Sequence, residues 1–184
     1  MKRTFVISLL FLTLFTSGYR KPDVYEIDAQ KNAYIHNNLG LTYVNEKCYY
    51  AAIQEYKIAI SLNPNTQATA VYYNNLGEVY LIIGYPDYAL DCFERALTQY
   101  SLNLRYYQNL AKTYQMLGTT DTQIAKYSDN SNPLNRIMLG LLYEQKGDIK
   151  RAITILDDFT MSEPDLLITP AIKAHIKDLV KKAD

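Results

Sequence analysis

Histidine, cysteine and paired acidic residues are the side chains in this sequence that could do chemistry, and they are few. The 184 residues include two histidines, His36 and His175, and two cysteines, Cys48 and Cys92. None has the spacing of a metal site or of a nucleophile with its base, and no phosphate-binding or zinc-protease motif occurs. Asp157-Asp158 are adjacent on an expected helix, so the two carboxylates point in different directions. The sequence predicts a protein that is not an enzyme and has no metal or cofactor.

The overall composition is that of a soluble helical protein. Hydrophobic residues make up 48% of the chain and charged residues 21%, and 19 basic residues balance 19 acidic ones. Nucleic-acid-binding domains usually carry a basic surface, so this charge balance argues against a nucleic-acid partner.

Residues 1–18 have the features of a secretory signal peptide. Lys2 and Arg3 precede an uncharged run from Phe5 to Phe15, and small residues follow up to Gly18. The run is shorter than the roughly 20 apolar residues of a membrane span, although an uncleaved N-terminal anchor is an alternative. We therefore expect an exported protein, periplasmic or extracellular, that meets a membrane only through this segment if it is retained.

Export would place both cysteines in an oxidising compartment. A disulfide between Cys48 and Cys92 is conceivable, but disulfide geometry is demanding, so two separate small hydrophobic residues are favoured.

The rest of the chain repeats one pattern of small and large residues. In each copy, a leucine, a glycine and a tyrosine lie on one face of a first expected helix. Two alanines with a large residue between them lie on one face of a second expected helix. Such a hairpin buries one side of each helix and needs neighbouring hairpins to cover the other. The clearest copy has Leu76, Gly77, Tyr80, Ala89, Phe93 and Ala96, and the copy before it has Leu39, Gly40, Tyr43, Ala52, Tyr56, Ala59 and Pro64.

Two further copies follow, and the first of these is irregular. It has Gln123 and Asn130 at the two alanine positions, and only 29 residues separate its Leu110 from Leu139 of the next copy. We therefore predict a shortened second helix that ends in the breaker run 128–133. The last copy is regular, with Leu139, Gly140, Tyr143, Gly147, Ala152 and Pro164.

This spacing resembles the tetratricopeptide repeat, a unit of about 34 residues with the pattern W-x2-L-G-x2-Y…A-x3-F…A…P. His36 and Tyr73 stand at the tryptophan position of the first two copies. The resemblance implies an all-α, right-handed α-solenoid of about four helical hairpins, with copies at 33–66, 70–103, 104–132 and 133–166. A lead-in over 19–32, with Asp23 as N-cap and Glu26 as its capping-box partner, would extend the first helix backwards.

Residues 167–184 are expected to form a C-terminal capping helix. Thr169 suits the N-cap and Pro170 the first helical position. Five apolar residues follow a helical stripe that can cover the open end of a solenoid. The alternative is a basic amphipathic helix at a membrane surface. The stripe is Ile168, Ile172, Ile176, Leu179 and Val180, and Lys173, Lys177, Lys181 and Lys182 lie away from it.

The resemblance also implies a binding site, because the first helix of each tetratricopeptide unit lines a concave groove. Transferred by position, the implied peptide- or protein-binding groove contains Asn37, Asn38, Leu41, Asn74, Asn75, Glu78, Arg105, Gln108, Asn109 and Lys112. Tyr34, Val71, Ile82 and Met116 occupy further inward-facing positions. In the last copy these positions are apolar and would either receive a hydrophobic anchor or be covered by the capping helix.

Asparagine recurs at one position of three copies, as Asn38, Asn75 and Asn109. A row of amides can donate to and accept from the backbone of any bound peptide, and the alternative is that each amide bonds its own neighbours. Arg105 and Lys112 are two helical turns apart and could hold a carboxylate.

These observations predict a non-catalytic scaffold that binds a peptide or protein segment and assists assembly of an envelope complex. Two alternatives stay open. The chain could be a self-associating structural subunit, using tyrosines outside the repeat pattern, or the binding part of a larger regulator. Those tyrosines are Tyr49, Tyr50, Tyr72, Tyr85, Tyr88 and Tyr106.

Overall fold

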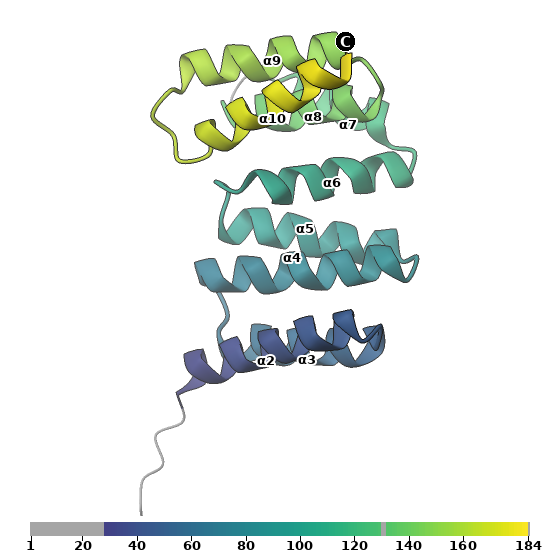
Figure 1. Ribbon diagram of the computed structural model, residues 1–184, viewed down its shortest axis with the longest axis vertical. Helices are drawn as coiled ribbons and strands as arrows, with labels where there is room; N and C mark the ends of the chain where they lie inside the picture. Colours follow the sequence, from purple (N-terminus) through teal and green to yellow (C-terminus); the bar gives the residue numbers. More distant parts are fainter. Residues whose placement is uncertain (1–27, 130–131, 184) are drawn as a thin grey trace, which may run out of the picture.

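The computed structural model describes residues 28–129 and 132–183, and these ranges form helices and their connections without any strand (Figure 1). The expected signal segment 1–18 and the capping box at Asp23 lie outside the described residues, as does Asn130. The helices are α2 (Ala29–Asn45), α3 (Tyr49–Leu62), α4 (Gln67–Ile82), α5 (Pro86–Gln99), α6 (Leu104–Met116), α7 (Thr120–Tyr127), α8 (Asn135–Gln145), α9 (Ile149–Ser162) and α10 (Thr169–Ala183).

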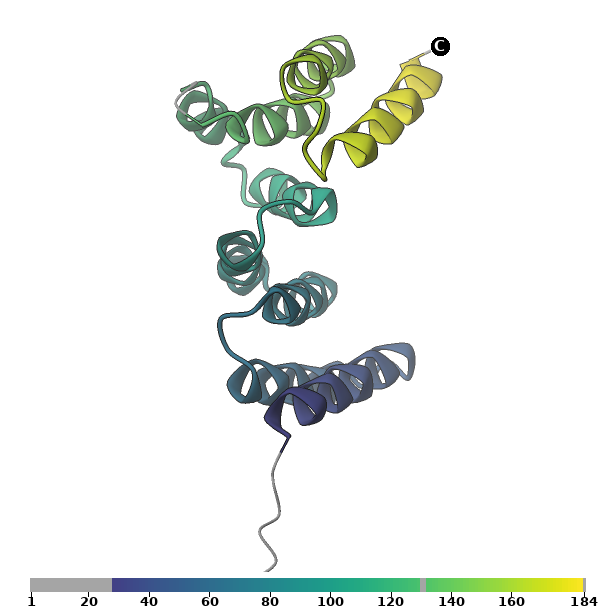
Figure 2. The ribbon, with the colours of Figure 1, turned by 90° about the vertical axis from the view of Figure 1, so that its left-hand side faces the viewer.

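Consecutive helices pair as hairpins, and the hairpins stack along the long axis of the molecule (Figure 1). The helices of the pairs α2–α3, α4–α5 and α8–α9 pack closely on each other, and α10 packs on α9. In the third pair, α6–α7, the two helices touch only slightly, and α7 packs more on α8 than on α6. Figure 2 shows the stack in profile, with α4 on one side and α5 on the other, and with α10 projecting from the α4 side. The all-α solenoid of helical hairpins predicted from the sequence is confirmed.

Three of the hairpins close over a glycine in the first helix. A Cβ atom on Gly77 would lie 2.6 Å from Cε1 of Phe93, and one on Gly40 would lie 2.5 Å from Cε1 of Tyr56. Gly140 meets Leu156 in the same way, at 2.6 Å from Cγ. Real Cβ atoms do not approach neighbours this closely, so each glycine lets a large side chain of the second helix lie against the backbone of the first.

The turns inside the hairpins share a left-handed residue. Gly84, Gly118 and Gly147 have φ angles of 83°, 70° and 86°, and Lys47 occupies the same place in the first hairpin with φ 61°. Only glycine adopts this conformation without steric cost. The first hairpin therefore carries backbone strain that the others lack.

Side-chain caps fix where several helices begin. Thr66 caps α4: its hydroxyl accepts from the Thr69 backbone N–H, and the Thr69 hydroxyl accepts from the Thr66 N–H. This reciprocal pair forms a capping box. Asp28 caps α2, with its carboxylate accepting from the Lys31 N–H at 2.9 Å.

The third hairpin is the irregular one, as its spacing predicts. Helix α7 has 8 residues, whereas α3, α5 and α9 have 14 each. None of its residues is fully buried. Gln123 stands where the other copies bury Ala52, Ala89 and Ala152, and its Oε1 is buried with no hydrogen-bond partner in the part of the chain that the structure describes.

We expect Gly77→Leu to lower the free energy of unfolding by about 1–3 kcal/mol, because the new side chain would overlap the Phe93 ring. Urea denaturation measures this change. The double variant Gly77→Leu/Phe93→Ala should lose less than the sum of the two single variants, since removing the ring frees the space. Additive losses would show that the two residues do not compete for one volume.

We expect Lys47→Gly to raise the free energy of unfolding by about 0.5–1 kcal/mol, since glycine relieves the left-handed strain at this turn. The same denaturation experiment reports the gain. Lys47→Ala keeps the strain and serves as the matched control, so an equal gain in both variants would contradict the explanation.

Candidate functional site

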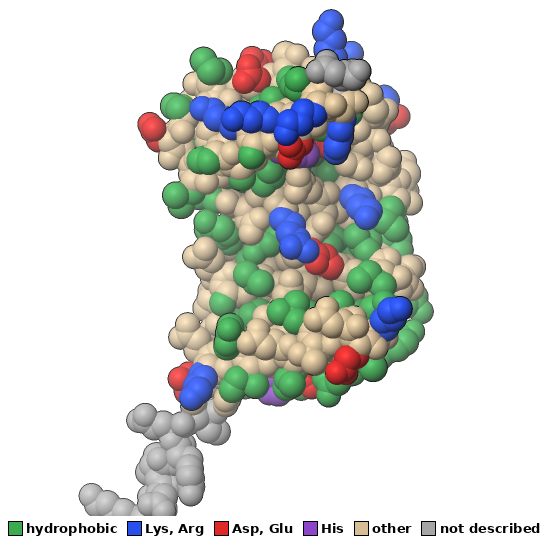
Figure 3. Space-filling view, viewed as in Figure 1, with side chains coloured by type: hydrophobic (Ala, Val, Ile, Leu, Met, Phe, Trp, Pro, Cys, Tyr) green, Lys and Arg blue, Asp and Glu red, His purple; other side chains and the backbone are tan. Residues whose placement is uncertain are grey.

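The residues implied for the groove lie on α2, α4 and α6, which form one face of the stack (Figure 3). Several apolar side chains on this face are exposed. Leu41 is 43% exposed, Ile82 54% and Met116 49%. Tyr34 and Val71 are also exposed, so the first three hairpins present an apolar surface along one side.

The asparagines of this face bond one another across hairpins. The Asn75 side-chain amide donates to Oδ1 of Asn37 at 2.9 Å, which joins α4 to α2. The Asn109 amide donates to Oδ1 of Asn74 at 2.8 Å, which joins α6 to α4. Asn37 and Asn74 are buried. These hydrogen bonds support the second of the two readings of the asparagine row, in which the amides bond their own neighbours.

Glu78 is the acceptor on which this polar network converges. Its Oε1 accepts from Asn74 at 2.9 Å, from Asn109 at 2.8 Å and from Arg105 Nε at 2.7 Å. Its Oε2 accepts from Arg105 Nη2 at 2.8 Å. The Arg105 guanidinium, expected from the sequence to be able to hold a ligand carboxylate, is instead held by this bidentate pair with Glu78. Lys112, exposed on the same helix, has no carboxylate partner in the described chain.

The C-terminal helix covers the last part of the concave face. Ile137, Met138 and Leu141 of α8 are buried in one cluster with Ile168 and Ile172. This is the second outcome considered for the last copy, in which the capping helix covers its apolar surface. The groove implied by the sequence would therefore be limited to α2, α4 and α6.

His175 fastens α10 to two other helices. Its Nε2 lies 2.7 Å from Oε2 of Glu144 on α8, and its Nδ1 lies 3.3 Å from Nε2 of Gln108 on α6. A neutral imidazole protonated on Nε2 satisfies both contacts, because it donates to the carboxylate and accepts from the amide. Gln108, implied for the groove, is thus in contact with the capping helix.

The structure brings together most of the implied groove residues, and their polar side chains mainly bond one another across the first helices. Glu78 was the residue whose role was missed. The available signal was its spacing from Asn74, four residues on the same helix, which suits a side-chain hydrogen bond. Leu41 and Lys112 are the implied residues that remain exposed without a polar partner.

Within residues 28–129 and 132–183, no cluster of three or more His, Cys, Asp or Glu residues could hold a metal ion. Cys48 and Cys92 are free, and burial raises the pKa of the Cys92 thiol to about 12, which keeps it protonated and unreactive.

None of the helices that the structure describes is long and apolar enough to cross a membrane.

Comparison with protein families gives two matches, both to models described as tetratricopeptide repeat, over residues 32–101 and 136–165. Among curated proteins, the chain is 29% identical over 107 residues to the photosystem I assembly protein Ycf3 of two strains of Prochlorococcus marinus. The match covers 58% of this chain and 61% of each relative, so the chain spans about three fifths of their length. A TPR repeat-containing protein of Methanocaldococcus jannaschii is 23% identical over 163 residues, which is 83% of this chain and 27% of that protein.

Solved structures share the fold. A tetratricopeptide repeat protein from Parabacteroides merdae superposes with a TM-score of 0.52 at 18% sequence identity, over 83% of this chain and 61% of that one. MamA superposes with a TM-score of 0.50 at 24% identity, over 74% of this chain and 81% of its own. At these identities the likeness concerns the architecture of stacked hairpins.

We expect Asn109→Ala to lower the free energy of unfolding by about 1–3 kcal/mol, because it leaves the buried Oδ1 of Asn74 without its donor. Thermal or urea denaturation measures the loss. Lys112→Ala, three residues further along the same helix and without a partner, is the matched control and should change stability little. Equal effects of both substitutions would contradict a structural role for the amide network.

Proposed function

The chain belongs to the tetratricopeptide repeat family, whose members are protein-interaction scaffolds, and we propose that it binds a polypeptide segment in the open groove of α2, α4 and α6. The observation that supports this proposal is the row of exposed apolar residues on the first three hairpins. Isolated exposed apolar side chains are ordinary, whereas an aligned set beside fixed polar groups is typical of a binding surface. The set consists of Tyr34, Leu41, Val71, Ile82 and Met116.

The polar network gives this groove a rigid floor. Asn75 and Asn109 tie neighbouring first helices together, and Glu78 holds Arg105 in place. A floor whose side chains are already ordered loses little conformational entropy when a ligand binds. We therefore assign most of the binding free energy to the exposed apolar residues and treat the asparagines as the support that keeps them aligned.

The covered end of the groove limits the length of the bound segment. Because α10 lies over α8, the ligand contacts three first helices instead of four. Neighbouring helices in such stacks lie about 8–10 Å apart, so three of them offer roughly 20–30 Å. An extended peptide of about six to nine residues spans that length.

We also propose that the protein is exported and acts in the assembly of an envelope complex. The features of residues 1–18 support export, and the similarity to a photosystem I assembly protein supports an assembly role as an analogy. N-terminal sequencing of the protein from fractionated native cells tests this proposal. An unprocessed N-terminus on protein in the cytosolic fraction would contradict it.

A photo-cross-linking residue at position 82, inside the groove, should capture a partner in the native cell. The same residue at position 58 is the matched control, because Ile58 is also exposed but lies on α3, outside the groove. Mass spectrometry of the products should identify a partner peptide joined at position 82 and absent at position 58. Capture at both positions alike would contradict a groove-specific function, and capture of a second copy of this chain would favour the self-associating subunit.

With the partner in hand, we expect Ile82→Asp to weaken its binding about tenfold or more, since a carboxylate would lose hydration against an apolar contact. Isothermal titration calorimetry measures the dissociation constant. Ile58→Asp should leave the constant unchanged. If instead Asn75→Ala, which leaves the apolar surface in place, abolishes binding in a protein of unchanged stability, the asparagines bind the partner directly.

A further inference from the structure

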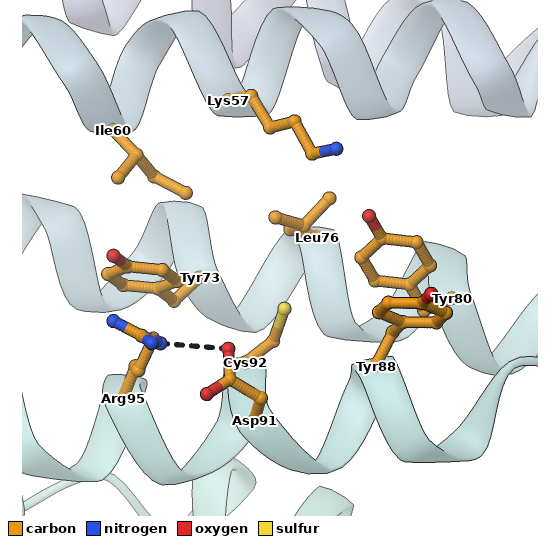
Figure 4. A pocket seen from close by; sticks show the side chains of 9 residues that line it. All are labelled: Lys57, Ile60, Tyr73, Leu76, Tyr80, Tyr88, Asp91, Cys92 and Arg95. Atoms are coloured by element: carbon orange, nitrogen blue, oxygen red, sulfur yellow. Dashed lines mark hydrogen bonds and ion pairs between the residues drawn. The ribbon is translucent and has the colours of Figure 1, made fainter.

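A cavity of about 350 Å³ lies between the first and second hairpins, on the side of α4 that faces away from the groove. Helices α3, α4 and α5 line it (Figure 4). Tyr73, Leu76 and Tyr80 face this cavity from α4, whereas Asn75 and Glu78 face the groove. With 3.6 residues per turn these two sets lie on opposite sides of the helix, so the cavity and the groove are separate.

The cavity has an apolar floor and one aromatic end. Leu76 and the Cys92 thiol are buried at its base, and Ile60 covers it from α3 (Figure 4). At one end the Tyr80 and Tyr88 rings are stacked, with centroids 5.3 Å apart and an interplanar angle of 27°. Tyr88 is 62% exposed, which leaves much of its aromatic surface free to contact a ligand.

The aromatic end is held in place from outside the cavity. The Tyr85 ring meets Tyr88 edge-on, with centroids 6.0 Å apart and an interplanar angle of 80°. Three aromatic rings therefore form one cluster at the start of α5. Aromatic pairs in these geometries attract each other beyond the area they bury, so the cluster offers a pre-formed surface for a further ring.

The charges around the cavity do not balance. The Arg95 guanidinium is 2.8 Å from the Asp91 carboxylate and lies 5.9 Å from the centroid of the Tyr73 ring, so both its charge and its position are accounted for. Lys57 is exposed on α3 and has no carboxylate partner among the described residues. Figure 4 shows its side chain running along the α3 side of the cavity toward the tyrosine end. The lining thus carries one cation beyond its ion pair.

We propose that this cavity is a second binding site, which takes an aromatic side chain that carries a carboxylate beside it, as a C-terminal aromatic residue of a partner polypeptide does. The ring would lie over Leu76 and against the Tyr80–Tyr88 pair, and the carboxylate would meet the Lys57 ammonium. A volume of about 350 Å³ is at the lower end of the roughly 300–1,000 Å³ of ligand pockets, which suits one large side chain. Because this site does not share residues with the groove, it stands independently of the proposed function.

The chain itself makes a direct test possible, because it contains no tryptophan. Excited at wavelengths beyond the absorption of the 18 tyrosines, a tryptophan ligand can therefore report on its own binding with little background from the protein. We would titrate N-acetyltryptophan, which has the ring and the carboxylate, and N-acetyltryptophanamide, which has the ring alone. The acid should bind with saturation and about threefold to fivefold more tightly than the amide, the range of a partly exposed ion pair.

Two variants locate the ligand. Lys57→Gln should abolish the preference for the acid, and Tyr88→Ala should weaken both ligands about twofold to tenfold. Both residues are exposed, so neither substitution should unfold the protein. Lys112→Gln and Tyr34→Ala make the matching changes in the groove and should change neither affinity.

Three results would overturn the proposal. The first is that neither ligand binds with saturation, and the second is that acid and amide bind with equal affinity. The third is that Lys112→Gln and Tyr34→Ala change the affinities while Lys57→Gln and Tyr88→Ala do not. The last result would place the ligand in the groove and support the proposed function instead. If Ile82→Asp does not weaken partner binding but Lys57→Gln abolishes the preference for the acid, the proposed function of the groove fails. The cavity then still stands as a binding site of the protein.

Discussion

The whole stack depends on how closely two helices of one hairpin can approach. At Gly40, Gly77 and Gly140 the missing side chain lets a ring or a leucine from the partner helix touch the backbone. Each contact sets the distance and angle within its hairpin, and each hairpin then presents a surface of fixed shape to the next. A repeat protein is stabilised mainly by contacts between neighbouring repeats. A substitution that changes the distance between the two helices of one hairpin therefore also disturbs the interfaces with the hairpins on both sides.

On the face formed by α2, α4 and α6, the polar side chains must be paired with one another when buried, yet polar side chains are also what a ligand could bind. Buried amides are costly unless every donor and acceptor is paired, and here Asn37, Asn74, Asn75 and Asn109 are paired across successive first helices. Pairing occupies the amide donors of Asn75 and Asn109 and the oxygens of Asn37 and Asn74, which leaves fewer polar groups for a ligand. In the proposed groove the exposed apolar side chains would then supply most of the affinity, through burial more than through hydrogen bonds that read the ligand's sequence.

Contacts that lie inside one hairpin and recur in the next could be predicted from the sequence. Contacts between residues of different hairpins could not. Gly77 and Phe93 are sixteen positions apart at matching places in their unit, so the helical pairing followed from spacing alone. The partners of Asn75 and Asn109 are 38 and 35 residues away, and which amide meets which depends on the lateral register of the stack. The contact of His175 with Glu144 and Gln108 likewise required the placement of the last helix. The cavity beside Lys57 has no repeat signature, because it arises where two hairpins do not fill the space between them.

The short helix α7 makes one segment of the stack weaker than its neighbours. It buries no residue completely, and the side-chain amide oxygen of its Gln123 is buried with no hydrogen-bond donor among the described residues. In a linear array, cooperativity passes from unit to unit only as long as each interface is strong enough to couple them. Helix α6 belongs to one continuous core cluster with residues of α5 and α8, so the stack stays coupled through α6, and α7 is the place where local opening of the chain is expected to begin.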